Sequence, residues 1–259
     1  MTVPTGVWQR DWIRRHGGAP DAGVAVRYVQ TPSVFGDIRI AAARPDLAHA
    51  ASFAELSDAE LAALAHQNGF AGVTTVDGRN ATWHHEIDFQ PAGDDADIGR
   101  IEPAGDARMF EHALDASYIE SWSAIDRGGG KFFAVRVVRA GRTDQLLAVA
   151  GAHFVYARAR PTALPAAASI SEAIATRHAT RDQIIAFLDC EISYGSVAGW
   201  QIERSTLPWR QGQRLALADR IAVDARGQPG PRAAAAGEAW SFPVNTLSAA
   251  ELQALFAQR

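Results

Sequence analysis

The strongest constraint on the fold is a series of short segments rich in branched and aromatic residues, which fills the first half of the chain. Turn residues such as Gly17-Gly18 and Asp77-Gly78 separate these segments. The pattern predicts eight β-strands, at residues 6–14, 24–30, 35–41, 70–76, 80–90, 97–101, 108–113 and 117–124. An open sheet of this size would leave two unpaired edges, and closure into an up-and-down barrel removes both. The first half therefore predicts a closed barrel that encloses side chains or one small ligand.

The second half begins after Gly128-Gly129-Gly130, which predicts a break between two domains, residues 1–127 and 128–259. Further strands are expected at residues 131–139, 145–150, 153–159, 188–194, 199–205, 214–217 and 239–243. Helices are expected where Ser or Thr precedes Glu or Gln by three residues, the spacing of a capping box. This spacing occurs at Ser57, at Thr180 within a helical stretch over 169–187, and at Ser248 near the C-terminus. The chain is thus expected to be mainly β, with a helix inserted in each half and a C-terminal helix.

The two halves share an order of events that indicates internal duplication. In the first half, a strand at 35–40 leads to Arg44-Pro45, a helix, and Glu86-Ile87. In the second, a strand at 153–158 leads to Arg160-Pro161, a helix, and Glu191-Ile192. The first copy has an extra strand pair between the helix and Glu86. The alternative is chance recurrence of short motifs.

Near the N-terminus, Gly6-Val7-Trp8 matches the Gly-x-Trp motif that opens lipocalin-like barrels. With residues 35–40 and 83–91, this motif makes the chain resemble the lipocalin-like (calycin) superfamily, and most of all a family of tandem lipocalin-like barrels of unknown function. The resemblance implies two tandem up-and-down β-barrels, with Trp8 plugging the closed end of the first. The helix between the early strands departs from secreted lipocalins, and so does the absence of a signal region.

Composition excludes several classes of function. A formal charge of −4 argues against a nucleic-acid binder, which would carry a basic stripe. Cys190 is the only cysteine, so an internal disulfide and a cysteine-based zinc site are both excluded, and a buried, inert thiol is expected there. Neither a basic-then-apolar leader nor an apolar stretch of about 20 residues is present. These features predict a soluble, cytoplasmic protein that does not insert into membranes.

Alternation along residues 80–90 places two different rows of side chains on the two faces of one strand. Trp83, His85, Ile87 and Phe89 share one face, and His84, Glu86, Asp88 and Gln90 share the other. On a neighbouring strand, Asp37 and Arg39 share a face with Phe35. If the polar rows point inward, they form a charged pocket in which Arg39 binds a carboxylate bidentately. We favour the outward alternative, a solvated polar face, because aromatic residues normally fill a barrel.

Tyr118, Glu120 and Trp122 share a face of the strand at 117–124. They are interpreted either as core aromatics with an ion pair or as groups for proton transfer. The predicted ligand lining combines Trp83, His85, Phe89, Tyr118, Glu120 and Trp122 with Arg39 and Glu86 as polar anchors. One regular strand cannot turn both Glu86 and its aromatic neighbours inward, so this set requires a bulge. His84, Glu86 and Asp88 are poorly placed to surround one ion, so neither a metal nor a cofactor is predicted.

The leading functional hypothesis is a lipocalin-like protein that binds a small, partly apolar ligand, hydrophobic or aromatic, in a barrel. Catalysis is the less favoured alternative: a cofactor-free lyase or isomerase that uses Arg39, Glu86 and Tyr118 and requires them to converge. A third hypothesis is a scaffold with filled barrels that binds a protein partner through an exposed apolar patch.

Overall fold

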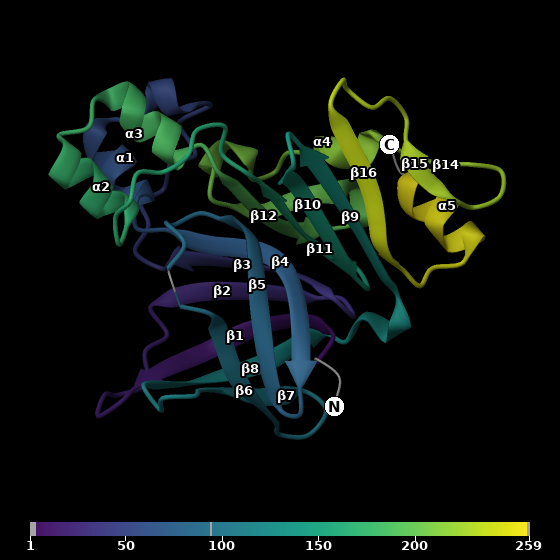
Figure 1. The fold of residues 1–259 in the computed structure, drawn as a ribbon, viewed down its shortest axis with the longest axis horizontal. Helices are drawn as coiled ribbons and strands as arrows, with labels where there is room; N and C mark the ends of the chain where they lie inside the picture. Colours follow the sequence, from purple (N-terminus) through teal and green to yellow (C-terminus); the bar gives the residue numbers. More distant parts are fainter. Residues whose placement is uncertain (1–3, 94, 258–259) are drawn as a thin grey trace.

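The computed structural model describes residues 4–93 and 95–257, which form a closed barrel and a second sheet packed against its outer wall (Figure 1). Each barrel strand pairs with the next in antiparallel fashion, and the last pairs with the first. The strands are β1 (Gly6–Arg15), β2 (Val24–Gln30), β3 (Val34–Ala41), β4 (Asn68–Asp77), β5 (Asn80–Asp88), β6 (Asp97–Pro103), β7 (Arg108–Ala113) and β8 (Tyr118–Asp126). The predicted closed eight-stranded barrel is confirmed.

The second half departs from the expected second barrel, because its strands form an open six-stranded sheet. The spatial order is β13-β12-β11-β10-β9-β16, so β13 and β16 are the edges. The strands are β9 (Phe132–Arg139), β10 (Arg142–Ala150), β11 (His153–Arg158), β12 (Glu191–Ser196), β13 (Gln201–Ser205) and β16 (Glu238–Asn245), with a separate pair β14 (Ile221–Val223) and β15 (Pro229–Pro231).

Both faces of this sheet are buried without closure. The barrel wall covers one face, and the C-terminal elements pack on the other through a separate apolar cluster that includes Trp200, Leu252 and Phe256. Pro243 in the edge strand β16 fits a position where one side of the strand has no ladder partner. The strand expected at residues 214–217 is instead the approach to a short helix, α4.

The helices begin where the capping spacing predicts. Ser57 and Thr180 form complete capping boxes, and Ser248 bonds with Glu251 in the same manner. His178 lies in the left-handed region, with φ at +48°, and divides the predicted 169–187 stretch into two helices. The α-helices are α1 (Asp58–Leu64), α2 (Ile170–Arg177), α3 (Arg181–Leu188), α4 (Ala216–Asp219) and α5 (Ala249–Ala257), and the 3-10 turns are η1 (Phe53–Glu55), η2 (Gly128–Gly130), η3 (Ala198–Trp200) and η4 (Pro208–Arg210). Among the described residues, no helix is long and apolar enough to span a membrane.

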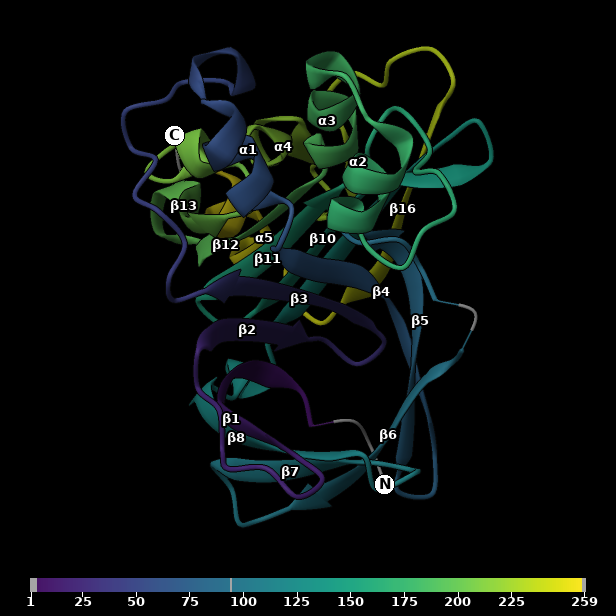
Figure 2. The same cartoon turned by 90° about the vertical axis from the view of Figure 1, so that its left-hand side faces the viewer.

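One apolar cluster joins the barrel to the second sheet. Strands β10, β11 and β12 contact β2, β3 and β5. At one end of this interface α1 lies beside α3, which in turn contacts α2 (Figure 2). The barrel supplies outward-facing Ile38 and Ile87, and the sheet supplies Val155 and Ile192. At Gly36 the layers approach so closely that a Cβ atom would lie 2.6 Å from Val155. Each buried aliphatic side chain of this kind contributes about 1.5–3 kcal/mol, so the interface is a main source of stability.

Candidate functional site

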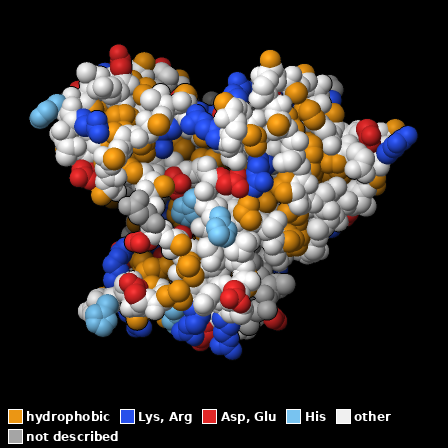
Figure 3. Space-filling model, in the orientation of Figure 1, with side chains coloured by type: hydrophobic (Ala, Val, Ile, Leu, Met, Phe, Trp, Pro, Cys, Tyr) orange, Lys and Arg blue, Asp and Glu red, His pale blue; other side chains and the backbone are white. Residues whose placement is uncertain are grey.

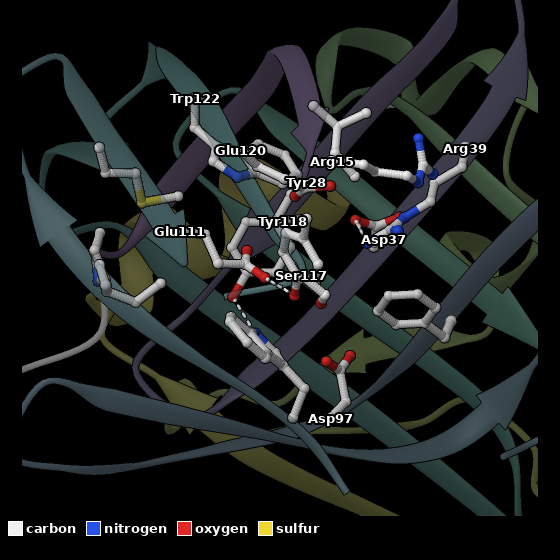
Figure 4. A pocket seen from close by; sticks show the side chains of 16 residues that line it. Arg15, Tyr28, Asp37, Arg39, Asp97, Glu111, Ser117, Tyr118, Glu120 and Trp122 are labelled. Atoms are coloured by element: carbon white, nitrogen blue, oxygen red, sulfur yellow. Dashed lines mark hydrogen bonds and ion pairs between the residues drawn. The ribbon is translucent and has the colours of Figure 1, made fainter. Parts of the chain in front are cut away.

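A cavity of about 370 Å³ lies inside the barrel, and all eight strands contribute to its lining (Figure 4). This volume falls within the range of about 300–1,000 Å³ that is usual for small-molecule sites. The lining residues are Pro4, Ile13, Arg15, Tyr28, Asp37, Arg39, Phe70, Trp83, Asp97, Ile101, Met109, Glu111, Ser117, Tyr118, Glu120 and Trp122.

Aromatic and aliphatic side chains make up the apolar part of the lining. The Tyr28 and Trp122 rings lie 5.9 Å apart, and the Trp83 indole donates a 2.9 Å hydrogen bond to the Tyr28 hydroxyl. Trp8 is buried in the same interior cluster, where its indole donates to the Pro4 carbonyl at 3.0 Å and Arg127 lies over its ring. The barrel is therefore packed around Trp8 and hollow beside Trp122.

Glu111 and Glu120 face each other across β7 and β8 and form the most unusual polar feature of the cavity. Glu120 is only 2% exposed, and one of its carboxylate oxygens accepts a hydrogen bond from Arg10. Its other oxygen is buried and has no hydrogen-bond partner among the described residues, and the same is true of the indole nitrogen of Trp122. Two residues that line the cavity therefore each carry a buried polar atom without a partner in the described part of the chain, one an acceptor and one a donor.

The protonation of Glu111 follows from its surroundings. Tyr118 donates a 2.8 Å hydrogen bond to one of its oxygens. Burial, together with the facing Glu120 carboxylate, raises the pKa of Glu111 to about 8. Near neutral pH this carboxyl group is therefore mostly protonated and neutral.

Arg39 points into the barrel beside Asp37, which corrects the interpretation of these residues as a solvated outer face. Its Nε donates to an Asp37 oxygen at 2.8 Å, and its guanidinium lies 4.8 Å from the centre of the Phe70 ring. Asp37 is 2% exposed, so the pair is held in the wall of the cavity. Arg15 also lines the cavity; it is exposed, and its side chain makes no hydrogen bond or ion pair with the described part of the chain.

His85 forms a second charged unit next to the cavity. Its ring stacks on Phe70 at 4.1 Å, and its two nitrogens lie 2.7 Å from Asp88 and 3.1 Å from Asp97. Burial alone would lower the pKa of His85, but the hydrogen bonds to Asp88 and Asp97 outweigh it and raise the pKa to about 9. The imidazole is therefore a cation whose charge is already balanced by two carboxylates.

The structure brings together five of the eight predicted lining residues, Arg39, Trp83, Tyr118, Glu120 and Trp122. His85 packs behind the lining residue Phe70. Glu86 and Phe89 lie outside the barrel, which corrects their expected placement. Glu86 contacts Arg136 and Thr143 of the second sheet, and Phe89 is buried in the cluster between barrel and sheet.

A bulge in β5 explains the error at Phe89, whereas Glu86 points outward by ordinary alternation from the inward-facing Trp83. Ala71 pairs with Ile87 and Gly72 pairs with His85, so Glu86 is the extra residue of the bulged strand. Alternation changes sense at this point, and Ile87 and Phe89 turn outward. Because Glu86 is outside, Arg39, Glu86 and Tyr118 do not converge, which removes the geometric basis of the proposed lyase or isomerase.

Sequence reasoning missed Glu111, Asp97 and Tyr28. The alternation of Met109 and Glu111 along 108–113 was available as a signal. It identifies the Glu111–Glu120 pair only when the register of the hairpin with 117–124 is also assigned.

The remaining candidates for a functional site, the single cysteine and a metal site, gain no support from the described part of the structure. Cys190 is buried, and burial raises the pKa of its thiol to about 11, which fits an unreactive side chain. The described residues contain no group of three or more His, Cys, Asp or Glu that could hold a metal ion. Basic and acidic side chains are interspersed over the face shown in Figure 3.

Comparison with known proteins supplies a fold and no activity. No family model matches the chain, and no curated protein matches it either. The uncharacterized protein YLR301w from Saccharomyces cerevisiae is similar in structure over 94% of this chain and 99% of its own, with a TM-score of 0.51 and 10% sequence identity. A lipocalin-like protein from Bacteroides uniformis aligns over 47% of this chain and 98% of its own, with a TM-score of 0.32 and 10% identity. At 10% identity, the likeness to the yeast protein shows a shared fold alone.

Proposed function

We propose that this protein binds one small, partly apolar organic molecule inside the barrel. The observation that carries the proposal is a cavity of about 370 Å³ whose lining holds two buried polar atoms without partners, on Glu120 and Trp122. Buried polar groups in folded proteins are almost always hydrogen-bonded, so these two groups are candidates for bonds to a ligand once the lining adjusts around it. A scaffold with filled barrels would leave no such cavity.

The aromatic walls and the polar groups have different roles in this proposal. The rings of Tyr28, Trp83 and Trp122 offer apolar contact area, which supplies most of the binding free energy. The few polar atoms orient the ligand and select its functional groups. The chemistry of the lining therefore favours a ligand with an apolar body and at least one polar group.

Binding is tested with three probes that share one phenol body and differ in charge: 4-ethylphenol, tyramine and 3-(4-hydroxyphenyl)propanoate. Thermal unfolding of the wild type is compared with that of two Ile→Trp variants. Ile101→Trp fills the cavity, whereas Ile125→Trp places the same side chain on an exposed position. We expect at least one probe to raise the Tm of the wild type and of Ile125→Trp, because a ligand that binds only the folded state stabilises it.

Ile101→Trp is expected to show no such increase. Equal increases in all three proteins would place binding outside the barrel and overturn the proposal. The absence of any increase in the wild type with all three probes would overturn it as well.

A further inference from the structure

We infer that the barrel selects an organic cation, a protonated amine on a small aromatic body, whose ammonium group binds between Glu111 and Glu120. This inference rests on the proposed function and specifies the chemical class of the ligand. The same molecule would carry a hydrogen-bond acceptor that reaches the indole nitrogen of Trp122.

The positions of the two carboxylates are the first observation behind this inference. Glu111 and Glu120 are directly opposite each other on β7 and β8, and both line the cavity. Like charges directly opposite on a sheet repel, and burial strengthens the repulsion. Arg10 already pairs with Glu120, so the remaining repulsion is relieved when Glu111 holds a proton or when a further cation lies beside it.

In the second place, the cations near this pair already have carboxylate partners, and one of those partners is Glu120. Arg10 on β1 bonds one oxygen of Glu120 and leaves the other without a partner. On β3, Arg39 is held by Asp37, and on β5, His85 is held by Asp88 and Asp97. No described cation contacts Glu111, whose one hydrogen-bond partner is Tyr118.

The surrounding groups favour a cation over an anion. Glu111 faces Tyr28 from β2, Asp97 from β6 and the Tyr118 hydroxyl from β8, in addition to Glu120 (Figure 4). The cation that acts on it most strongly among the described residues is Arg39 from β3, which favours the ionised form of Glu111 but is already paired with Asp37. An ammonium group has three N–H donors, which suits two carboxylates, and aromatic faces attract cations. Trp122 lies beside this pair with its indole nitrogen unpartnered, so an oxygen atom on the ligand completes that contact. Two described lining residues are basic and could meet an anion: Arg15, which is exposed, and Arg39, whose charge Asp37 already balances.

Proton exchange distinguishes this arrangement from simple apolar binding. An ammonium group favours the ionised form of Glu111, so binding near neutral pH displaces the Glu111 proton. The affinity is then expected to rise by up to about tenfold per pH unit between pH 6 and pH 8, because one proton is exchanged. Above the pKa of the amine itself, the affinity falls again.

Isothermal titration calorimetry tests this with the three phenol probes in two buffers of different ionisation enthalpy. We expect tyramine to bind at least about tenfold more tightly than 4-ethylphenol, and 3-(4-hydroxyphenyl)propanoate to bind most weakly. Only tyramine should release a proton, which the difference between the two buffers measures. If 4-ethylphenol or the propanoate bound as tightly as tyramine, the inference would fall while the proposed function stood. If none of the three bound, both would fall.

Two variants assign the effect to the carboxylate pair. Glu111→Gln retains an oxygen that accepts the Tyr118 hydrogen bond and mimics the protonated carboxyl group, so it is expected to fold. It should weaken tyramine at least about tenfold, abolish proton release and leave 4-ethylphenol unchanged. The matched control is Glu102→Gln, because the Glu102 side chain is 46% exposed outside the cavity. An unchanged affinity for tyramine in Glu111→Gln overturns the inference. Trp122→Phe removes the N–H donor together with the five-membered part of the indole ring, and it should weaken all three probes, since each carries the phenol hydroxyl.

Discussion

At the scale of single residues, the least ordinary group in the molecule is the Glu111 carboxyl. Its pKa of about 8 in the folded protein lies above the reference value of 4.5. Between these two pH values the folded state binds more protons than the unfolded chain. The free energy of unfolding therefore falls as pH rises through this window.

Glu111→Gln should remove this pH dependence. Relative to the wild type, we expect the variant to gain stability as pH rises from 5 to 9, by at most about 1.4 kcal/mol per pH unit. Urea unfolding at a series of pH values measures the difference, with Glu102→Gln as the control. A constant difference between Glu111→Gln and the wild type at every pH would show that Glu111 titrates normally.

His85 is a second group whose pKa is shifted, and it is a base that is charged when protonated, whereas Glu111 is an acid. Its pKa is raised from 6.5 to about 9, so its stabilising contribution is complete below pH 6.5 and is lost as pH rises through 9. Asp97→Asn replaces one of its two carboxylate partners by a neutral amide and is expected to lower the pKa of His85. NMR titration of the imidazole measures both values, and an unchanged pKa in Asp97→Asn would assign the shift to Asp88 alone.

Much of the candidate site could be predicted from alternation, because inward positions on a regular strand follow from spacing alone. That rule identifies Tyr118, Glu120 and Trp122 as one row, and the structure places all three in the cavity lining. It cannot decide which face is inward when a polar row such as Asp37–Arg39 is buried as an ion pair. Burial of that pair depends on a partner, and partners across strands are not visible in one segment.

At the scale of elements, the bulge in β5 has the largest effect on the site. Trp83 lies inside the barrel and Glu86 outside it by ordinary alternation, and the bulge then turns Ile87 and Phe89 outward as well. The extra residue requires close approach by the neighbouring strand, where Gly72 has no side chain. A Cβ atom at Gly72 would lie 2.0 Å from the carbonyl oxygen of His84.

Gly72→Ala should therefore distort the β4–β5 ladder. We expect a loss of at least about 1–3 kcal/mol in the free energy of unfolding, as for other overpacked sites. Urea unfolding measures it, with Gly230→Ala as the control, since nothing lies within 4 Å of a Cβ atom built there. Equal stability of both variants would mean that the bulge tolerates a side chain.

At the scale of the whole molecule, the barrel and the second sheet share one core. The sequence-based expectation of two similar closed barrels fails for the second half, because other parts of the chain cover both faces of its sheet. The pattern of residues within a segment predicts strands and helix caps. It does not show which distant segment of the chain will cover a sheet face, because that depends on tertiary packing. The internal duplication stays a prediction, since one half forms a closed barrel and the other an open sheet, and the two do not share a strand arrangement.

A shared core predicts unfolding in one cooperative step. Ile192→Ala, in the sheet but buried against the barrel, should destabilise both parts together by about 2–5 kcal/mol. Tryptophan fluorescence and far-UV circular dichroism should give coincident transitions, with the exposed Ile125→Ala as the control. Two separated transitions would show that the barrel and the sheet unfold independently.

Different strands of the barrel contact the second sheet and line the cavity, and this separation has an evolutionary consequence. Strands β2, β3 and β5 provide the wall against which the second sheet packs, whereas the β7–β8 hairpin supplies Glu111, Tyr118, Glu120 and Trp122 to the cavity. Ligand preference can therefore diverge through substitutions in one hairpin without disturbing the shared core. Among descendants of a common ancestor, inward positions of β7 and β8 should vary with the molecule that is bound, while Gly36 and Gly72 persist. The same hairpin is the natural segment to randomise in a library designed to give this scaffold a new specificity.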